Sequence, residues 1–416
     1  MNNNYKTLKL ACYSTNVTMS VVGNISPLLF LTFRSIYGFS YSMLGFLVFV
    51  NFCTQLIVDL VFSFFSNKFD IAKTVKLTPV ISVVGLLIYA LAPVLFPGFV
   101  YGGILIGTLI FSASSGLAEV LISPVIAAIP AEDPDKEMSK LHSVYAWGVV
   151  GVILVSTVFL FVFGSKNWQY LIFLLMLIPV FASLVFQKSE IPYMPTIEKV
   201  SGVLKFLKSK TVLICIFAIF LGGAMECTMA QWASGLLEKA FGIKKTIGDI
   251  FGVAFFSVML GLGRTMYAKS GKNIENVLLI GAIGAFICYV AVAVTSSWVV
   301  GIIACAITGL CVSMLWPGSL IVASNLNKGG GVVLYALMAA GGDLGASVGP
   351  QLVGVIADIS INNSFVKSIA LKSGILAEQL GMKFGILIGA LFSLIAIFVF
   401  IHIKKSLTLA NKEKIV

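Results

Sequence analysis

Twelve long apolar stretches constrain this chain of 416 residues more than any other feature. The hydrocarbon core of a bilayer is about 30 Å thick, so a helix needs about 20 apolar residues to cross it. Backbone groups in lipid must be hydrogen-bonded within their own segment, and runs of this length can therefore only be helices. The stretches are residues 9–34, 41–66, 74–96, 99–129, 141–164, 168–187, 210–238, 247–268, 275–295, 297–325, 331–358 and 380–404. They predict an all-α membrane protein with twelve transmembrane helices.

The composition excludes several other classes of protein. Charged residues make up only 11% of the chain, whereas a soluble domain carries about 25%. The 32 Phe residues are too many for a disordered chain. The seven Cys lack metal spacing and only two His are present, so we expect neither a disulfide framework nor a metal centre. Nothing in the sequence calls for a cofactor.

The basic residues indicate how the chain is oriented in the membrane. With the N-terminus in the cytoplasm, the inside segments carry 20 Lys or Arg and the outside segments carry 8, which accounts for all 28. The positive-inside rule then predicts that both termini are cytoplasmic. Basic loops on one side of a membrane explain the net charge of +11, and we expect no nucleic-acid partner. The first apolar stretch has full span length, so we expect it to be retained rather than cleaved.

The chain divides into two sets of six spans. The longest inside connection between spans covers residues 188–209, and we interpret it as a cytoplasmic linker. Residues 1–187 are then an N-terminal six-helix bundle, and residues 210–416 are a C-terminal one.

An internal repeat links the two halves. Gly116-Leu117 and Pro124 recur as Gly309-Leu310 and Pro317, each 193 residues later. The same offset relates Leu141 to Leu334 and Gly148 to Gly341. A shared register with two Gly pairs and a Pro pair indicates duplication. Two parallel six-helix bundles with a site between them are typical of secondary transporters.

At these residues the chain resembles the major facilitator superfamily over its whole length, and more narrowly the fucose-permease-like sugar:proton symporters of bacteria. The resemblance rests on residues 116–124, 141–148, Glu226 with Gln231-Trp232, residues 261–264, 316–318 and 341–350. It implies two pseudo-symmetric six-helix bundles, a sugar-like solute, a monomer and a location in the bacterial plasma membrane.

Three acids in the spans are candidates for proton coupling: Glu119, Glu226 and Asp343. An ionisable group at the bilayer centre costs about 2.5–3.5 kcal/mol on insertion scales, so it usually faces a cavity or a partner. Glu119 shares a helix face with Gly116 and Ser123, which suits a water-filled path. The structural alternative for each acid is a local hydrogen bond to a neighbouring helix, backbone or Ser.

Several polar and aromatic residues are candidates for solute binding. A ring covers the apolar C–H surface of a sugar while amides and acids take its hydroxyl groups. The candidates are Asn51, Gln55, Ser123, Tyr145, Trp147, Gln231, Trp232, Trp316 and Ser347. The alternative for Tyr145, Trp147 and Trp316 is ordinary packing, and for Trp232 it is an interfacial anchor.

Three further residues are candidates for gating. Asp59 follows Asn51 and Gln55 on one face of the second span, nearer the predicted cytoplasmic side. Arg264 ends the eighth span and His142 begins the fifth, both on that side. The alternative for Arg264 is a snorkelling anchor.

The leading hypothesis is a proton-coupled secondary transporter of a small polar solute, with the proton and the bilayer as its other partners. Efflux of amphipathic, drug-like compounds is the second hypothesis, because many Phe could line a greasy cavity. A non-transporting receptor or scaffold is the alternative from another class. No Gly-x-x-x-x-Gly-Lys-Ser/Thr loop for ATP is present, and no nucleophile–base pair indicates an enzyme.

Overall fold

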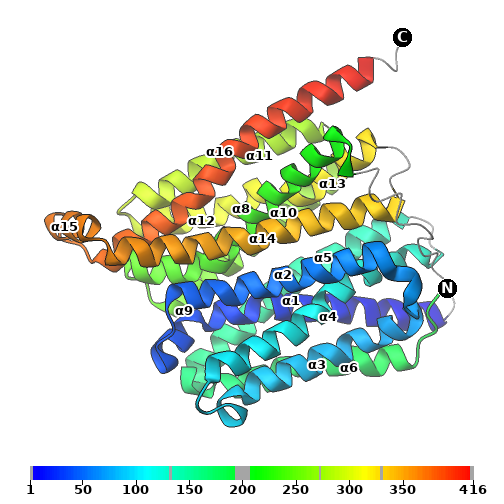
Figure 1. The fold of residues 1–416 in the computed structure, drawn as a ribbon, viewed down its shortest axis with the longest axis horizontal. Helices are drawn as coiled ribbons and strands as arrows, with labels where there is room; N and C mark the ends of the chain where they lie inside the picture. Colours follow the sequence, from blue (N-terminus) through cyan, green and yellow to red (C-terminus); the bar gives the residue numbers. More distant parts are fainter. Residues whose placement is uncertain (1–2, 131–133, 193–206, 271–272, 328–330, 413–416) are drawn as a thin grey trace. The chain divides into compact units, whose positions relative to one another are not determined.

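The computed structural model describes residues 3–130, 134–192, 207–270, 273–327 and 331–412 (Figure 1). In these ranges all regular structure is helical, and twelve helical segments are long and apolar enough to cross a membrane. The predicted all-α fold with twelve spans is therefore confirmed. Most of the predicted linker, residues 193–206, lies outside the described ranges.

Most consecutive spans are joined by short connections, and the longest lies between residues 187 and 210 (Figure 1). The first six spans are α1 (Asn3–Tyr37), α2 (Tyr41–Phe65), α3 (Ile71–Leu95), α4 (Val100–Ala128), α5 (Pro134–Phe163) and α6 (Trp168–Gln187). The next six are α8 (Lys210–Phe241), then α9 (Lys245–Ile247) with η3 (Gly248–Ala254) and α10 (Phe255–Ser270), then α11 (Ile274–Val294), α12 (Trp298–Val312) with α13 (Leu315–Leu326), α14 (Gly331–Asn362) and α16 (Ala377–Lys412). The short helices η1 (Ser66–Lys68), η2 (Ser165–Asn167) and α15 (Ser364–Lys372) lie in connections.

Local capping explains where α8 begins and ends. The Ser209 hydroxyl accepts the backbone N–H of Val212, which satisfies one of the free donors of the first turn. At the other end Gly242 adopts φ +68°, a left-handed conformation that glycine accepts without a steric penalty. These two residues set a helix of 32 residues, long enough to cross the bilayer and extend beyond it.

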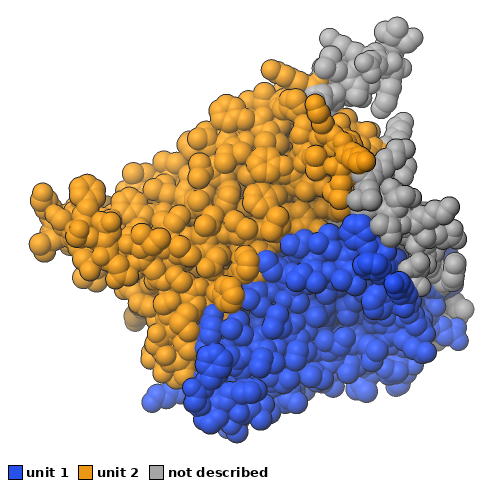
Figure 2. Space-filling model, in the orientation of Figure 1, with its two compact units in different colours: residues 1–32, 50–200 blue, residues 33–49, 201–416 orange. Residues whose placement is uncertain are grey.

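The helices form two compact units (Figure 2). Unit 1 comprises residues 1–32 and 50–200, and unit 2 comprises residues 33–49 and 201–416. Unit 2 thus contains the end of α1 and the start of α2 in addition to the helices from α8 onward.

Polar contacts hold the 33–49 segment within unit 2. The Tyr41 hydroxyl donates to Glu378 Oε1 at 2.7 Å, and the Arg34 guanidinium lies 3.4 Å from the same oxygen. The backbone N–H of Ser42 donates to Asp358 Oδ2 at 2.7 Å. The Tyr41 ring also packs edge-on against Trp232, with 6.0 Å between centroids. Hydrogen bonds and aromatic packing together explain why this segment belongs with α8, α14 and α16.

The repeated glycines occupy matching positions in each unit. A Cβ at Gly116 would lie 3.0 Å from a Cα of α2, and one at Gly309 would lie 3.1 Å from a Cα of α10. In the same way Gly148 packs against α1 and Gly341 against α8. Small residues let helix backbones approach closely in a membrane, so the sequence repeat marks the same helix contacts in both units.

Candidate functional site

The tenth span is broken into α12 and α13 just before Pro317. Proline has no backbone N–H, and in a continuous helix its ring would clash with the carbonyl of the residue four positions earlier. That residue is Ser313, whose carbonyl oxygen instead accepts a hydrogen bond from Arg264 Nε at 3.1 Å. A guanidinium group from α10 thus replaces the helical partner that Pro317 removes.

Arg264 also forms an ion pair with Glu226, in the middle of α8. Its Nη2 atom lies 3.0 Å from Glu226 Oε1 and 3.1 Å from Oε2. The two side chains are 24% and 14% exposed, so the charges are largely removed from solvent and from lipid. Each supplies the opposite charge that an ionised group in a membrane requires. Sequence reasoning proposed both residues but did not pair them.

Trp316, at the start of α13, packs against α8 and α14 within unit 2. A Cβ at Gly342 would lie 2.5 Å from two carbons of its six-membered ring, and one at Gly223 would lie 2.9 Å from a third. The indole ring therefore packs directly on the backbones of α8 and α14. Any residue larger than glycine at Gly223 or Gly342 would displace it. Glu226 follows Gly223 by three residues, which puts it on the same face of α8 one turn on.

The acid of α14 is buried in unit 2. Asp343 is 1% exposed and Ser347 is fully buried. The Ser347 hydroxyl donates to the Asp343 backbone carbonyl at 2.7 Å, the usual bond of a serine inside a helix. The two candidates thus occupy adjacent turns of one helix.

Gln231 and Trp232 lie further along α8, and both are buried. The Trp232 indole N–H donates to the Pro350 carbonyl at 2.9 Å, and its ring packs against Tyr41. Trp232 therefore has the contacts of a packing residue in unit 2, away from the helix turn that carries Glu226.

In unit 1 the polar face of α2 meets α4. The Asn51 side-chain oxygen accepts hydrogen bonds from Gln55 Nε2 at 3.1 Å and from Ser112 Oγ at 2.6 Å. All three side chains are buried. Sequence reasoning found the two amides but missed Ser112, because it is one of several serines in its span and no pattern distinguishes it from the others.

Two carboxylates come together further along the same helices of unit 1. Oxygens of Asp59 and Glu119 lie within 4.8 Å of each other. Asp59 is fully buried and Glu119 is partly buried. Two ionised carboxylates at this distance repel each other, and a shared proton or a small cation removes the repulsion. The sequence placed these acids in different roles, as a gate and a proton carrier.

The remaining candidates of unit 1 lie on α4 and α5. Ser123 and Tyr145 are partly buried, and the Tyr145 carbonyl accepts a hydrogen bond from Ser20 at 2.8 Å. Trp147 is 61% exposed. The side chain of His142 lies outside the described part of the chain, so its predicted role stays a prediction.

One polar cluster of unit 2 was not predicted. Asp249 is 2% exposed and lies in the π-helical turn η3, where its carboxylate accepts from Lys245 Nζ at 2.5 Å and from the Ser234 hydroxyl. Lys245 stands four residues before Asp249, a spacing that suits an ion pair on a helix. That spacing was the available signal.

The family model described as Major Facilitator Superfamily matches residues 11–350. The match covers most of the chain, which therefore belongs to this superfamily of membrane transporters. The resemblance seen in the sequence is thereby confirmed. No curated protein matches the chain significantly.

Solved structures of transporters share the fold at low sequence identity. A bacterial homolog of the human lysosomal transporter Spinster, inward-facing and occupied, has a TM-score of 0.75 and 11% identity over 97% of this chain and 98% of its own. A D-xylose–proton symporter has a TM-score of 0.73 and 15% identity over 95% and 97% of the two chains. The E. coli fucose:proton symporter has a TM-score of 0.61 and 13% identity over 95% and 99%. At these identities the likeness is one of fold.

Proposed function

We propose that this transporter moves a small polar, sugar-like solute by alternating access, with a proton as the coupling ion. The observation that carries the proposal is the pair of carboxylates, Asp59 and Glu119, within 4.8 Å of each other on two spanning helices of unit 1. Such a pair can hold one proton between its two carboxyl groups, which removes their mutual repulsion, and can release that proton when its surroundings change. Two of the structural neighbours are described as symporters of a sugar and a proton.

Unit 2 supplies the groups that suit a polyhydroxylated solute. The Glu226 carboxylate and the Arg264 guanidinium accept and donate hydrogen bonds, respectively, and neither is fully buried. The flat Trp316 ring lies on the same face of α8. A carboxylate and a guanidinium recognise sugar hydroxyls, and an aromatic ring recognises the apolar C–H face of the sugar ring. The proposed location is the bacterial plasma membrane, as the resemblance implies, with both termini cytoplasmic, as the basic loops predict.

Transport in proteoliposomes tests the proton role. Purified protein is first screened by thermal shift against D-xylose, fucose, nucleosides and lipophilic cations at two pH values, because a ligand that binds the native state stabilises it. Uptake of the stabilising compound is then measured with and without an inward proton gradient. Glu119→Gln is expected to abolish gradient-driven uptake while solute exchange without a gradient persists.

Glu190→Gln is the matched control, because the same change is made on an exposed residue after α6. It should transport like the unaltered protein. Gradient-driven uptake that survives Glu119→Gln would remove the proposed proton role. If lipophilic cations stabilise the protein and no sugar does, efflux of amphipathic compounds would replace import of a polar solute as the proposed function.

A further inference from the structure

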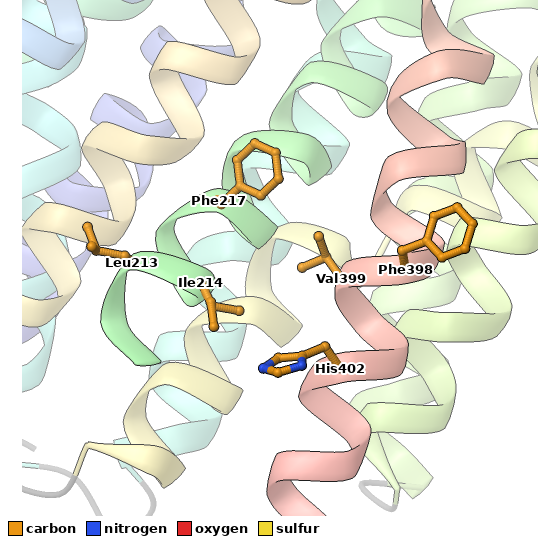
Figure 3. Close-up of a pocket in the computed structure, with 6 residues that line it drawn as sticks. All are labelled: Leu213, Ile214, Phe217, Phe398, Val399 and His402. Carbon is orange, nitrogen blue, oxygen red and sulfur yellow. The ribbon is translucent and has the colours of Figure 1, made fainter. Parts of the chain in front are cut away.

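An apolar groove runs along the surface of unit 2 between α8 and α16 (Figure 3). It has a volume of about 450 Å³ and is lined by Leu213, Ile214, Phe217, Phe398, Val399 and His402. The first three residues lie near the start of α8 and the last three near the end of α16. The two helices pack against each other as antiparallel neighbours.

Five of the six lining side chains are apolar, and several are open to the surroundings. Leu213, Phe217 and Phe398 are 45%, 43% and 67% exposed. All the lining residues belong to candidate membrane spans, so a hydrocarbon chain is the natural medium around them. A groove between two spanning helices leaves the side chains on its walls without contacts until a flexible apolar chain fills it.

Positive charge gathers at one end of the groove. His402 is its polar lining residue, and its imidazole points toward α8 (Figure 3). Lys210 precedes Leu213 and Ile214 by three and four residues, so it continues the same face of α8 by one turn. Lys405 continues the His402 face of α16 in the same way, and both lysines are exposed.

The start of α8 adds to this charge. Its first turn lies at the same end as His402, and Ser209 caps only one of its free N–H groups, that of Val212. The N-terminus of a long helix carries a partial positive charge that attracts anions. Apolar walls with a cationic end are complementary to a lipid with an acyl chain and an anionic headgroup.

We propose that the groove binds one anionic phospholipid, with an acyl chain along its apolar walls and the phosphate at the end formed by His402, Lys210 and Lys405. A zwitterionic lipid lacks the net charge that this end recognises. A free phosphate lacks the chain that the walls would bury. The site is separate from the groups assigned to solute and proton, so it stands or falls independently of the proposed transport cycle.

Native mass spectrometry of the delipidated full chain tests the proposal. Phosphatidylglycerol and phosphatidylcholine with identical acyl chains are titrated in detergent. We expect one phosphatidylglycerol molecule to bind tightly and phosphatidylcholine to bind more weakly. Near a membrane surface each lysine contributes about 1 kcal/mol to anionic-lipid attraction, so the double variant K210Q/K405Q should bind phosphatidylglycerol roughly thirtyfold more weakly.

Leu213→Trp tests the walls, because the larger side chain fills the groove from an exposed position and leaves the protein core unchanged. It should abolish the tight site for phosphatidylglycerol. The matched controls are Leu391→Trp, at a position of α16 that is 50% exposed and outside the groove, and the double variant K188Q/K269Q on exposed lysines. Both controls should bind as the unaltered protein does.

Three outcomes would overturn the proposal. Equal affinity for the two lipids would show a merely apolar surface. Unchanged phosphatidylglycerol binding in K210Q/K405Q or in Leu213→Trp would place the lipid elsewhere. Displacement of the bound lipid by millimolar inorganic phosphate alone would show an anion site without a role for the chain.

Discussion

The contact between Arg264 and the broken tenth span gives a sharp test of the site. Arg264→Met removes both bonds to Glu226 and the bond to the Ser313 carbonyl. Removing one partner of a largely buried ion pair costs about 3–5 kcal/mol. The orphaned Ser313 carbonyl should add about 1–3 kcal/mol to this loss, because it has no helical donor while Pro317 lacks an N–H.

A double-mutant cycle separates the two contributions. In Pro317→Ala the alanine N–H can donate to the Ser313 carbonyl and close the helix. Arg264→Met should then cost about 1–3 kcal/mol less in this background than in the unaltered protein. The measurement is denaturant unfolding of the purified protein in detergent, with the free energy taken from the midpoint and slope.

Pro350→Ala is the control, since it makes the same change in α14 and does not free an N–H beside Ser313. The cost of Arg264→Met should be unchanged in that background. Equal costs in all three backgrounds would refute the idea that the guanidinium replaces the helical donor. Arg264 would then act only through Glu226.

Two further predictions concern packing and pH. Gly342→Ala should lower the free energy of unfolding by about 1–3 kcal/mol, because the alanine Cβ would lie 2.5 Å from the Trp316 ring. Adding Trp316→Phe should recover part of this loss. An unchanged loss in the double variant would contradict the contact between Gly342 and the indole ring. The pKa of Asp70 is held below its ordinary 3.8, chiefly by the backbone N–H of Lys73 and next by the Lys73 ammonium. The stability that this cap gives α3 is therefore present above pH 3.8 and is lost as the pH falls below that value. Hydrogen exchange of the first turn of α3, corrected for the intrinsic rate, should show this loss in the unaltered chain and a flat profile in Asp70→Asn.

The sequence predicted the spans because each is encoded by its own residues. Length and apolar content alone identify a membrane helix, and all twelve predicted stretches match helical spans in the described chain. The helix ends differ more: α1 begins at Asn3 and α14 continues to Asn362, since helical hydrogen bonds extend through polar residues beyond the apolar stretches. Helix α15 was missed, being too short and polar for a span, although Asn363 caps its first turn.

The candidate site was predictable as a set of residues but not as a set of contacts. An ionisable residue inside an apolar span is rare and therefore easy to recognise, so Glu226 and Glu119 could be found from one sequence. Their partners could not, because Arg264 follows Glu226 by 38 positions and reaches it from another helix. Which faces of two helices meet depends on how the helices rotate and pack, and no local pattern in the sequence specifies that.

The membership of residues 33–49 in unit 2 matters for any attempt to make the halves as separate fragments. A polypeptide of residues 210–416 would retain Glu378 and Asp358 but lack Tyr41 and the rest of the segment that binds them. Such a fragment would expose acceptors that the intact chain satisfies. We therefore expect it to need co-expression with the N-terminal fragment, so that complementation restores these hydrogen bonds.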